Sequence, residues 1–187
     1  MASCLALFDL LYNLSDYENP QPKDLPMKLI TIILSLLISG FTYAGHHENN
    51  VAAQNITKAT QFMQTVLTEP EVAKGLLHDD FDFEFMGVSQ LSNVMYNKET
   101  YFSKWLVTVG ELIPAGFRKL EVVDAIGDKQ GVALMVEGDA DGINGLYDNK
   151  YVFIFKFSEG QIISLREYNS DLLVETRLYK QKVVADD

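Results

Sequence analysis

The chain has 187 residues, of which 48% are hydrophobic and 11% aromatic, with a formal net charge of −11. This length and apolar content suit one domain with an ordinary core and exclude two large ones. The basic residues are scattered among an acidic excess, so no nucleic-acid partner is expected. The single cysteine, Cys4, excludes a disulfide framework and a cysteine zinc site; we expect no metal and no cofactor.

The N-terminal part of the chain has the pattern of a targeting segment. Residues 27–44 read MKLITIILSLLISGFTYA, in which a lysine precedes an apolar run that ends in small residues. This order predicts a signal peptide cut after Ala44 and a periplasmic or secreted protein. The run is shorter than the roughly 20 residues of a membrane span, so no membrane association is expected after cleavage. An N-terminal membrane anchor or a buried helix is the alternative. Translation starts at Met1 or at Met27.

The folded domain is expected at 52–180, after an extension at 1–44 and a flexible tail at 45–51. Apolar residues at helical spacing predict a helix over 52–68, and Pro70 suits the first turn of a short helix ending near Leu77. Strict alternation of phenylalanine with acidic residues over 81–85 predicts a strand. Asn97 is expected to cap a longer helix over 98–112.

The second half of the domain reads as strands and turns. Residues 118–126, 131–138, 146–157 and 161–169 form the expected strands, with a loop or irregular edge at 87–96 and a loop at 139–145. Residues 171–179 are expected to close the chain as a helix. Helices followed by a meander of strands predict an α+β fold with a curved antiparallel sheet covered on one face by three N-terminal helices. Such a sheet leaves an internal pocket at its curved end.

The closing strand changes from apolar to polar residues and supplies the main candidate for a site. Alternation puts Ile163, Leu165, Glu167 and Asn169 on one face, so Glu167 is expected to face the pocket as the candidate catalytic residue. In the other interpretation, Glu167 only accepts hydrogen bonds at the edge of the sheet.

The remaining candidates are polar or aromatic residues expected at the wall of the same pocket. Asn149 and Tyr151 share one parity on their strand, and the alternative for Asn149 is a structural role in a turn. The aromatic residues of the 81–85 strand and the long helix are core and pocket wall at once. The predicted ligand-binding residues are therefore Asn149, Tyr151, Phe85, Tyr101, Trp105 and Asn169.

The closing hairpin contains Tyr147-x-Asn149-x-Tyr151, the apolar run to Phe157, Glu159-Gly160-x-Ile162 and Arg166-Glu167-Tyr168, and the long helix begins with Asn97-Lys98-Glu99. With these motifs, of which the last is the weakest, the chain resembles the SnoaL-like branch of the nuclear-transport-factor-2-like superfamily. The resemblance covers about residues 52–175. It implies a cone-shaped sheet with an internal pocket for a small molecule, and the superfamily supports many chemistries on this scaffold.

The chain departs from the known catalytic constellations of this superfamily. The position of the ketosteroid-isomerase base falls on Phe85, and the first helix offers Phe62 where those enzymes have a tyrosine. Relatives that hydrolyse limonene epoxide need an arginine between Arg118 and Arg166, where this chain has none. Ser170 stands where SnoaL-type polyketide cyclases have a further aspartate.

Two functions follow from this sequence. The first is a secreted or periplasmic domain that binds a small, largely apolar molecule without turnover. The second is an acid/base enzyme, resembling a polyketide cyclase, an isomerase or a dehydratase, that uses Glu167. A homodimer through the outer face of the sheet is compatible with either.

Overall fold

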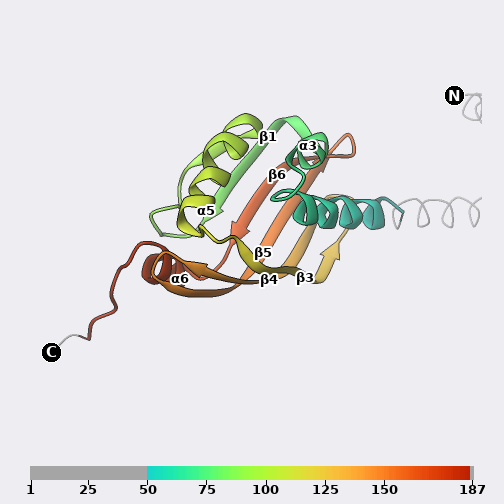
Figure 1. Ribbon diagram of the computed structural model, residues 1–187. Helices are drawn as coiled ribbons and strands as arrows, with labels where there is room; N and C mark the ends of the chain where they lie inside the picture. The colour runs from blue at the N-terminus through green and yellow to red at the C-terminus, as the bar shows by residue number, and fades with distance from the viewer. Residues whose placement is uncertain (1–49, 186–187) are drawn as a thin grey trace, which may run out of the picture. The chain divides into compact units, whose positions relative to one another are not determined.

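One six-stranded sheet carries the fold of residues 50–185, the part of the chain that this computed structural model describes (Figure 1). The strand order is β2-β1-β6-β5-β4-β3. The strands are β1 (Leu77–Met86), β2 (Met95–Asn97), β3 (Phe117–Gly127), β4 (Gly131–Gly142), β5 (Gly145–Ser158) and β6 (Gln161–Tyr168). Together with the helices they make an α+β domain, as the sequence predicts.

The sheet is mixed, which corrects the expectation of a purely antiparallel one. Each pair from β3 to β6 is antiparallel, and so is the pair of β1 with β2, but β1 and β6 run parallel. Residue patterns indicate where a strand lies, but they do not encode the direction in which two strands far apart in the chain meet. The expectation holds for the other four pairs and is wrong for β1 with β6.

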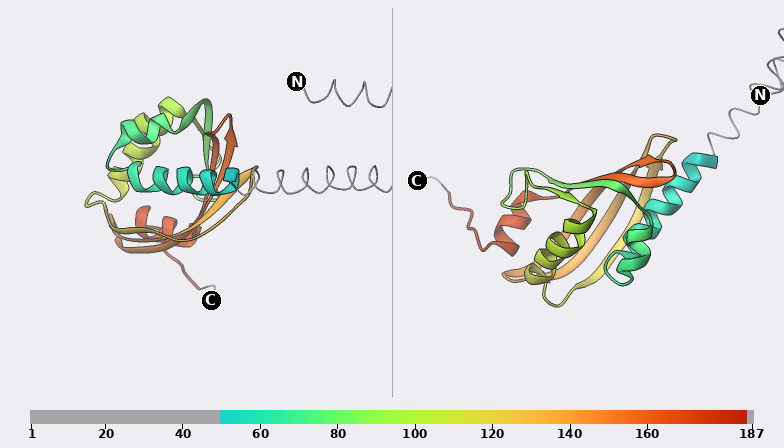
Figure 2. Two further views of the ribbon diagram at one scale, coloured as in Figure 1. Left: turned by 90° about the vertical axis from the view of Figure 1, so that its right-hand side faces the viewer. Right: turned by 90° about the horizontal axis from the view of Figure 1, so that it is seen from above.

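The sheet is strongly curved, and the helices lie on its concave side (Figure 2). The helix of residues 50–65 runs inside the curve, and the ring of Phe62 in its last turn lies 6.0 Å from that of Phe155 on β5, centroid to centroid. Residues 50 and 51, placed by sequence in the flexible tail, are helical. A short helix, α3 (Pro70–Gly75), follows and ends two residues earlier than expected.

The longer helix begins where the sequence predicts. Asn97 accepts a hydrogen bond from the backbone N–H of Thr100 at 2.9 Å, and the Thr100 hydroxyl accepts from the backbone N–H of Asn97. This reciprocal cap starts α4 (Lys98–Thr100), which continues through the π-helical turn η1 (Tyr101–Trp105) into α5 (Leu106–Leu112). The π-helical turn buries both of its terminal residues, and such turns are frequent at functional sites.

The aromatic face of β1 is the main contact between this helix and the sheet. Phe81, Phe83 and Phe85 are fully buried, as their alternation predicts. The ring of Phe83 lies 4.9 Å from that of Tyr101 and 4.8 Å from that of Trp105, centroid to centroid. Tilted and edge-on aromatic pairs at these distances contribute about 0.5–1.5 kcal/mol each beyond their buried area. They fix the side chains of η1 against the sheet.

Two predicted loops contain more regular structure than expected. Strand β2 occupies the end of the predicted 87–96 loop. Strands β4 and β5 extend through most of 139–145, leaving Ile143 and Asn144 as the turn, and Gly145 after it has a φ of 106° that favours glycine. The chain then closes with α6 (Asp171–Leu173) and the π-helical turn η2 (Val174–Leu178).

Candidate functional site

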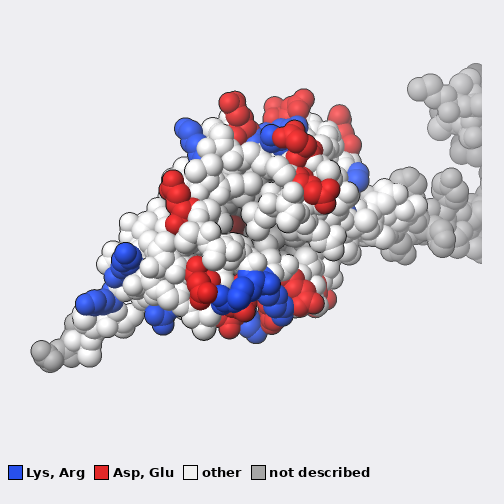
Figure 3. Space-filling model, in the orientation of Figure 1, with Lys and Arg blue, Asp and Glu red and all other residues white. Residues whose placement is uncertain are grey.

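A cavity of about 70 Å³ lies between the concave face of the sheet and the helices. Figure 3 shows it as a hollow rimmed mostly by uncharged residues, with an acidic side chain at its floor. Glu167 is the only charged residue among those that line it. The others are apolar or aromatic: Met63, Val66, Leu67, Phe85, Leu91, Tyr101, Trp105, Leu106, Val109, Leu112, Ile113, Phe117, Leu120, Tyr147, Tyr151, Phe153 and Leu178.

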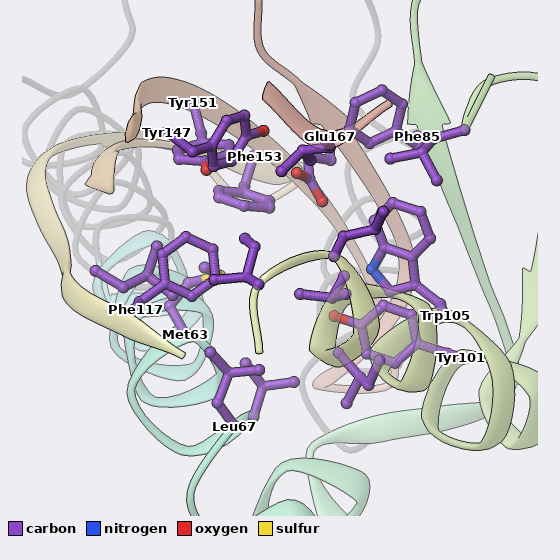
Figure 4. A pocket seen from close by; sticks show the side chains of 18 residues that line it. Met63, Leu67, Phe85, Tyr101, Trp105, Phe117, Tyr147, Tyr151, Phe153 and Glu167 are labelled. Carbon is purple, nitrogen blue, oxygen red and sulfur yellow. The ribbon is translucent and has the colours of Figure 1, made fainter. Parts of the chain in front are cut away.

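Glu167 reaches the cavity through the pleat of β6. Its neighbours across the sheet are Phe153 on β5 and Phe85 on β1, so aromatic side chains flank it on both sides. Its carboxyl group projects into the cavity (Figure 4), and only 8% of the residue is exposed. The alternation that predicted this orientation holds for Leu165 and Glu167. The alternation fails at Ile163, which has no partner on β5 because Phe157 pairs with Ile162 and Lys156 with Ser164. This extra residue is a β-bulge, and as a result Ile162 is fully buried in place of Ile163.

The carboxyl group of Glu167 has one hydrogen bond and no cationic partner within residues 50–185. Asn169 Nδ2 donates to Glu167 Oε1 at 3.2 Å. Burial raises the pKa of Glu167 to about 8, and the hydrogen bond from Asn169 opposes this rise only in part. Glu167 is therefore mostly protonated at neutral pH. Because Oε1 accepts from Asn169, we place the acidic proton on Oε2.

Three tyrosines supply the other polar atoms of the cavity. Burial raises the pKa of Tyr101 and Tyr151 far above the usual range and that of Tyr147 to about 12, so all three are neutral. Figure 4 shows the hydroxyl of Tyr101 directed into the cavity, and it forms no hydrogen bond with any described residue. The Tyr147 hydroxyl accepts from Asn149 Nδ2 at 3.0 Å.

The hydroxyl of Tyr151 is buried and has no hydrogen-bond partner among residues 50–185. It interacts electrostatically with Tyr147 without reaching hydrogen-bond geometry. The ring is stacked on that of Phe153, with centroids 5.6 Å apart and planes 18° from parallel. It also lies over Gly138, where an added Cβ would come within 2.8 Å of Tyr151 Cε2. The absence of a side chain at residue 138 therefore makes room for this ring.

The structure brings most of the predicted site residues together. Phe85, Tyr101, Trp105, Tyr151 and Glu167 all line the cavity. The two predicted asparagines are not among the lining residues; they contact lining residues instead.

Asn149 is buried and bonded on both sides. In addition to its bond to Tyr147, its Oδ1 accepts from the backbone N–H groups of Lys150 at 2.9 Å and Ser170 at 3.4 Å. Asn169 contacts the carboxyl group of Glu167. Both asparagines therefore hold residues of the cavity in place.

Sequence reasoning missed part of the wall. Tyr147 and Phe153 share the parity of Tyr151 on β5, so continued alternation could have found both. Phe117 on β3 and the residues from helix 50–65, such as Met63, carried no comparable signal, because their exposure to the cavity depends on how distant elements dock.

The described residues contain neither metal-ligand groups nor membrane-spanning helices. Among residues 50–185, no group of three or more His, Cys, Asp and Glu side chains is placed to hold a metal ion. The same part of the chain has no helix long and apolar enough to cross a membrane.

Comparison with known proteins identifies the fold. No family model and no curated protein sequence matches the chain. Solved structures do: Bal32a, from a soil-derived mobile gene cassette, has a TM-score of 0.60 and 17% identity, covering 69% of this chain and 98% of its own. A provisionally named SnoaL-like polyketide cyclase from Jannaschia has a TM-score of 0.59 and 16% identity, covering 71% and 96%. An NTF2-like protein from Burkholderia xenovorans has a TM-score of 0.59 and 12% identity, covering 68% and 97%.

These structures show that the domain has the fold of NTF2-like and SnoaL-like proteins, which is the fold that the resemblance of the closing hairpin predicted. At this level of identity the likeness establishes the fold and leaves the chemistry to the site. Two observations already set this site apart from the constellations considered above. Phe85, the position that the resemblance assigns to the isomerase base, is an apolar residue of the wall, and Glu167 is the only carboxylate among the lining residues.

Proposed function

We propose that the domain binds a small, largely apolar molecule in the cavity, with Glu167 as the polar group that orients it. The cavity wall is aromatic and aliphatic, which favours an apolar ligand, and a few convergent polar atoms are typical of ligand sites. The observation that carries the proposal is Glu167 itself. A buried acid with no cationic partner is costly, so its presence in the wall calls for a compensating role.

The proposal extends to the shape and location of the protein. The cone shape of the superfamily, with three helices around the cavity, is proposed for the complete domain. Export to the periplasm or the exterior rests on the pattern of residues 27–44, which lie outside the described residues. A homodimer through the outer face of the sheet, with no nucleic-acid or membrane partner, completes the proposal.

Binding can be tested through Trp105, the only tryptophan of the chain, which lines the cavity. Its indole N–H gives a single NMR signal, which should shift saturably with cyclohexanone and with the hydrocarbon methylenecyclohexane. Val109 lines the cavity from α5, whereas Val107 on the same helix is 53% exposed and does not. Val109→Phe should fill the cavity and abolish both shifts, and Val107→Phe should leave them unchanged. If no probe shifts the signal, or if Val109→Phe still binds, the proposal is wrong.

An acid/base enzyme is the second candidate, and the pKa of Glu167 favours it. Proton transfer is most efficient when the pKa of the catalytic group is near the working pH, and a pKa of about 8 meets this condition. If Glu167 abstracts protons, the protein should speed the exchange of the α-hydrogens of cyclohexanone with D₂O, and Glu167→Gln should remove the effect. Equal exchange rates for wild type and Glu167→Gln would exclude this activity with that probe.

A further inference from the structure

Glu167 presents to the cavity an oxygen that no protein group uses. Asn169 Nδ2 donates to Oε1, whereas Oε2 forms no hydrogen bond with any residue of 50–185. Oε2 is also not among the polar atoms that the protein buries without a partner, in contrast to Asn169 Oδ1. A molecule that occupies the cavity can therefore reach Oε2, on the side toward which the carboxyl group projects (Figure 4).

The cavity contains no positive charge to match this carboxyl group. No Lys, Arg or His is among the lining residues in the described part of the chain. The neighbouring Arg166 lies on the opposite face of β6, where it pairs with Asp82 and Glu84. An opposite charge at close range stabilises the ionised form of a buried acid. A counter-ion for Glu167 has to come from a ligand.

The wall around Glu167 suits a cation. Phe85 and Phe153 pair with Glu167 across the sheet, one on each side. The ring of Trp105 lies 5.5 Å from that of Phe85, centroid to centroid, and the hydroxyl of Tyr101 offers an oxygen as a further acceptor. The faces of aromatic rings attract cations. The net charge of −11 likewise draws cations toward the protein.

We propose that the cavity takes a small organic ammonium ion with an apolar body, whose N–H group donates to Oε2 of an ionised Glu167 while its apolar part contacts the aromatic wall. This inference rests on the proposed function and names the class of its ligand. In the free protein Oε2 carries a proton. When the ammonium ion binds, this proton passes to the solvent and the N–H group takes its place. Asn169 continues to donate to Oε1 and holds the carboxylate in position.

Binding of the ammonium ion should depend on pH through Glu167. The titratable groups that face it are Tyr101 on η1 and Tyr147 and Tyr151 on β5, and burial raises the pKa of these tyrosines to about 12 or beyond, so they stay neutral. β1, β3, α5, η2 and the helix of residues 50–65, with the segments that join them, contribute only apolar residues to the lining. Because the pKa of Glu167 is about 8, the affinity for the cation should rise up to pH 8 and level off above it.

The test compares cyclohexylammonium with methylenecyclohexane, an uncharged probe of nearly the same shape, through the indole signal of Trp105. A primary amine of this kind stays protonated in the neutral range. The wild type should bind the cation about 50-fold more tightly at pH 8 than at pH 6 and the hydrocarbon equally at both. Glu167→Gln should remove this pH dependence. It should weaken cation binding at pH 8 by about tenfold or more, because a hydrogen bond between charged groups is lost, and leave the hydrocarbon unchanged.

Glu111→Gln is the matched control. Glu111 is an exposed residue of α5, the helix that also supplies Val109 to the cavity wall. The substitution removes the same charge from the surface, so both affinities and the pH dependence should stay as in the wild type. Val109→Phe should abolish the binding of both probes, which separates the cavity from the acidic surface as the place where the cation binds.

Titration calorimetry gives a readout that needs no variant. Measurements at pH 7 in two buffers of different ionisation enthalpy report the protons that binding releases. Cyclohexylammonium should release about 0.9 proton per molecule bound, because Glu167 is mostly protonated beforehand, and methylenecyclohexane should release none.

Three outcomes would overturn the inference while leaving the proposed function intact. In the first, methylenecyclohexane binds in the cavity and cyclohexylammonium does not. In the second, the cation binds wild type and Glu167→Gln equally at pH 8, or binds without releasing a proton at pH 7. In the third, cyclohexanone binds more tightly than cyclohexylammonium at pH 8, which would show that the cavity selects a neutral polar group. If none of the three probes shifts the Trp105 signal, both proposals are wrong.

Discussion

Arg166 and Glu167 are adjacent on β6, yet the pleat of the strand places them in opposite environments. Arg166 faces outward, where Nη1 donates to Asp82 Oδ1 and Nε lies 3.6 Å from Glu84 Oε2, in a partly exposed ion-pair cluster. Glu167 faces inward, where aromatic residues surround it and no cation is present among the lining residues. On the outer face of β6 the charge of Arg166 is paired with carboxylates and partly hydrated. On the inner face the raised pKa of Glu167 keeps its carboxyl group protonated and neutral.

The difference predicts two kinds of energetic behaviour. The outer charges are partly screened by water and salt, so each pair stabilises the fold little. The pKa of the inner carboxyl group is set mainly by the cost of burying its ionised form, so its contribution to stability depends strongly on pH. Substitutions on the two faces therefore test whether the two environments differ in this way.

The largest effect is expected for Glu167→Gln. A glutamate in the unfolded chain has a pKa of about 4.3, whereas folding raises the pKa of Glu167 to about 8. Between these two values the folded state binds a proton that the unfolded state has released, so the stability of the wild type falls as pH rises. Relative to Glu167→Gln, the wild type should lose on the order of a few kcal/mol between pH 4.5 and 8, and nothing further above that.

Urea denaturation of both proteins at a series of pH values measures this difference. A constant gap in the free energy of unfolding across the range would contradict the account.

A smaller effect is expected for Gly138→Ala. The added Cβ would lie 2.8 Å from Tyr151 Cε2 and 3.3 Å from Phe117 Cε1, so the Tyr151 ring must move. Overpacking of this kind typically costs about 1–3 kcal/mol. Gly110→Ala on α5 is the matched control, because no atom lies within 4 Å of its added Cβ and alanine favours a helix by up to about 1 kcal/mol. Equal thermal stability of the two variants would show that Gly138 does not make room for Tyr151.

The smallest effect is expected on the outer face, for Asp82→Asn. Asp82 accepts from Arg166 and, at 2.9 Å, from the Ser164 hydroxyl, but its side chain is 42% exposed. The loss of stability should stay below about 1 kcal/mol and should shrink as salt is added. Denaturation at low and high ionic strength measures it. A loss as large as that expected inside the cavity would remove the contrast between the two faces.

The sequence predicted those features that depend on local periodicity. Alternation placed the phenylalanines of β1 and Glu167 of β6 toward the interior, and the cap at Asn97 marked the start of a helix. The parallel pairing of β1 with β6 could not be predicted, because it depends on how strands distant in the chain meet. The extra residue at Ile163 interrupts the alternation without any Gly or Pro to signal it.

The candidate site was predictable to the same extent. Parity indicated that Asn149 and Asn169 share a face with Tyr151 and Glu167. It could not show that their amide groups bond to Tyr147 and Glu167, because a side chain chooses its partner through rotamer and packing. The space over Gly138 is likewise a property of the folded sheet.

The most direct test of the central claim is the titration of Glu167 itself. The side-chain carboxyl carbon can be labelled with ¹³C, and its NMR signal can be assigned by its absence from Glu167→Gln. Its chemical shift should then be followed from pH 3 to pH 10. The account predicts a midpoint near 8, because burial without a cationic partner disfavours the ionised form. A midpoint near 4, the ordinary value for a glutamate in water, would show that Glu167 is ionised at neutral pH and would contradict the account.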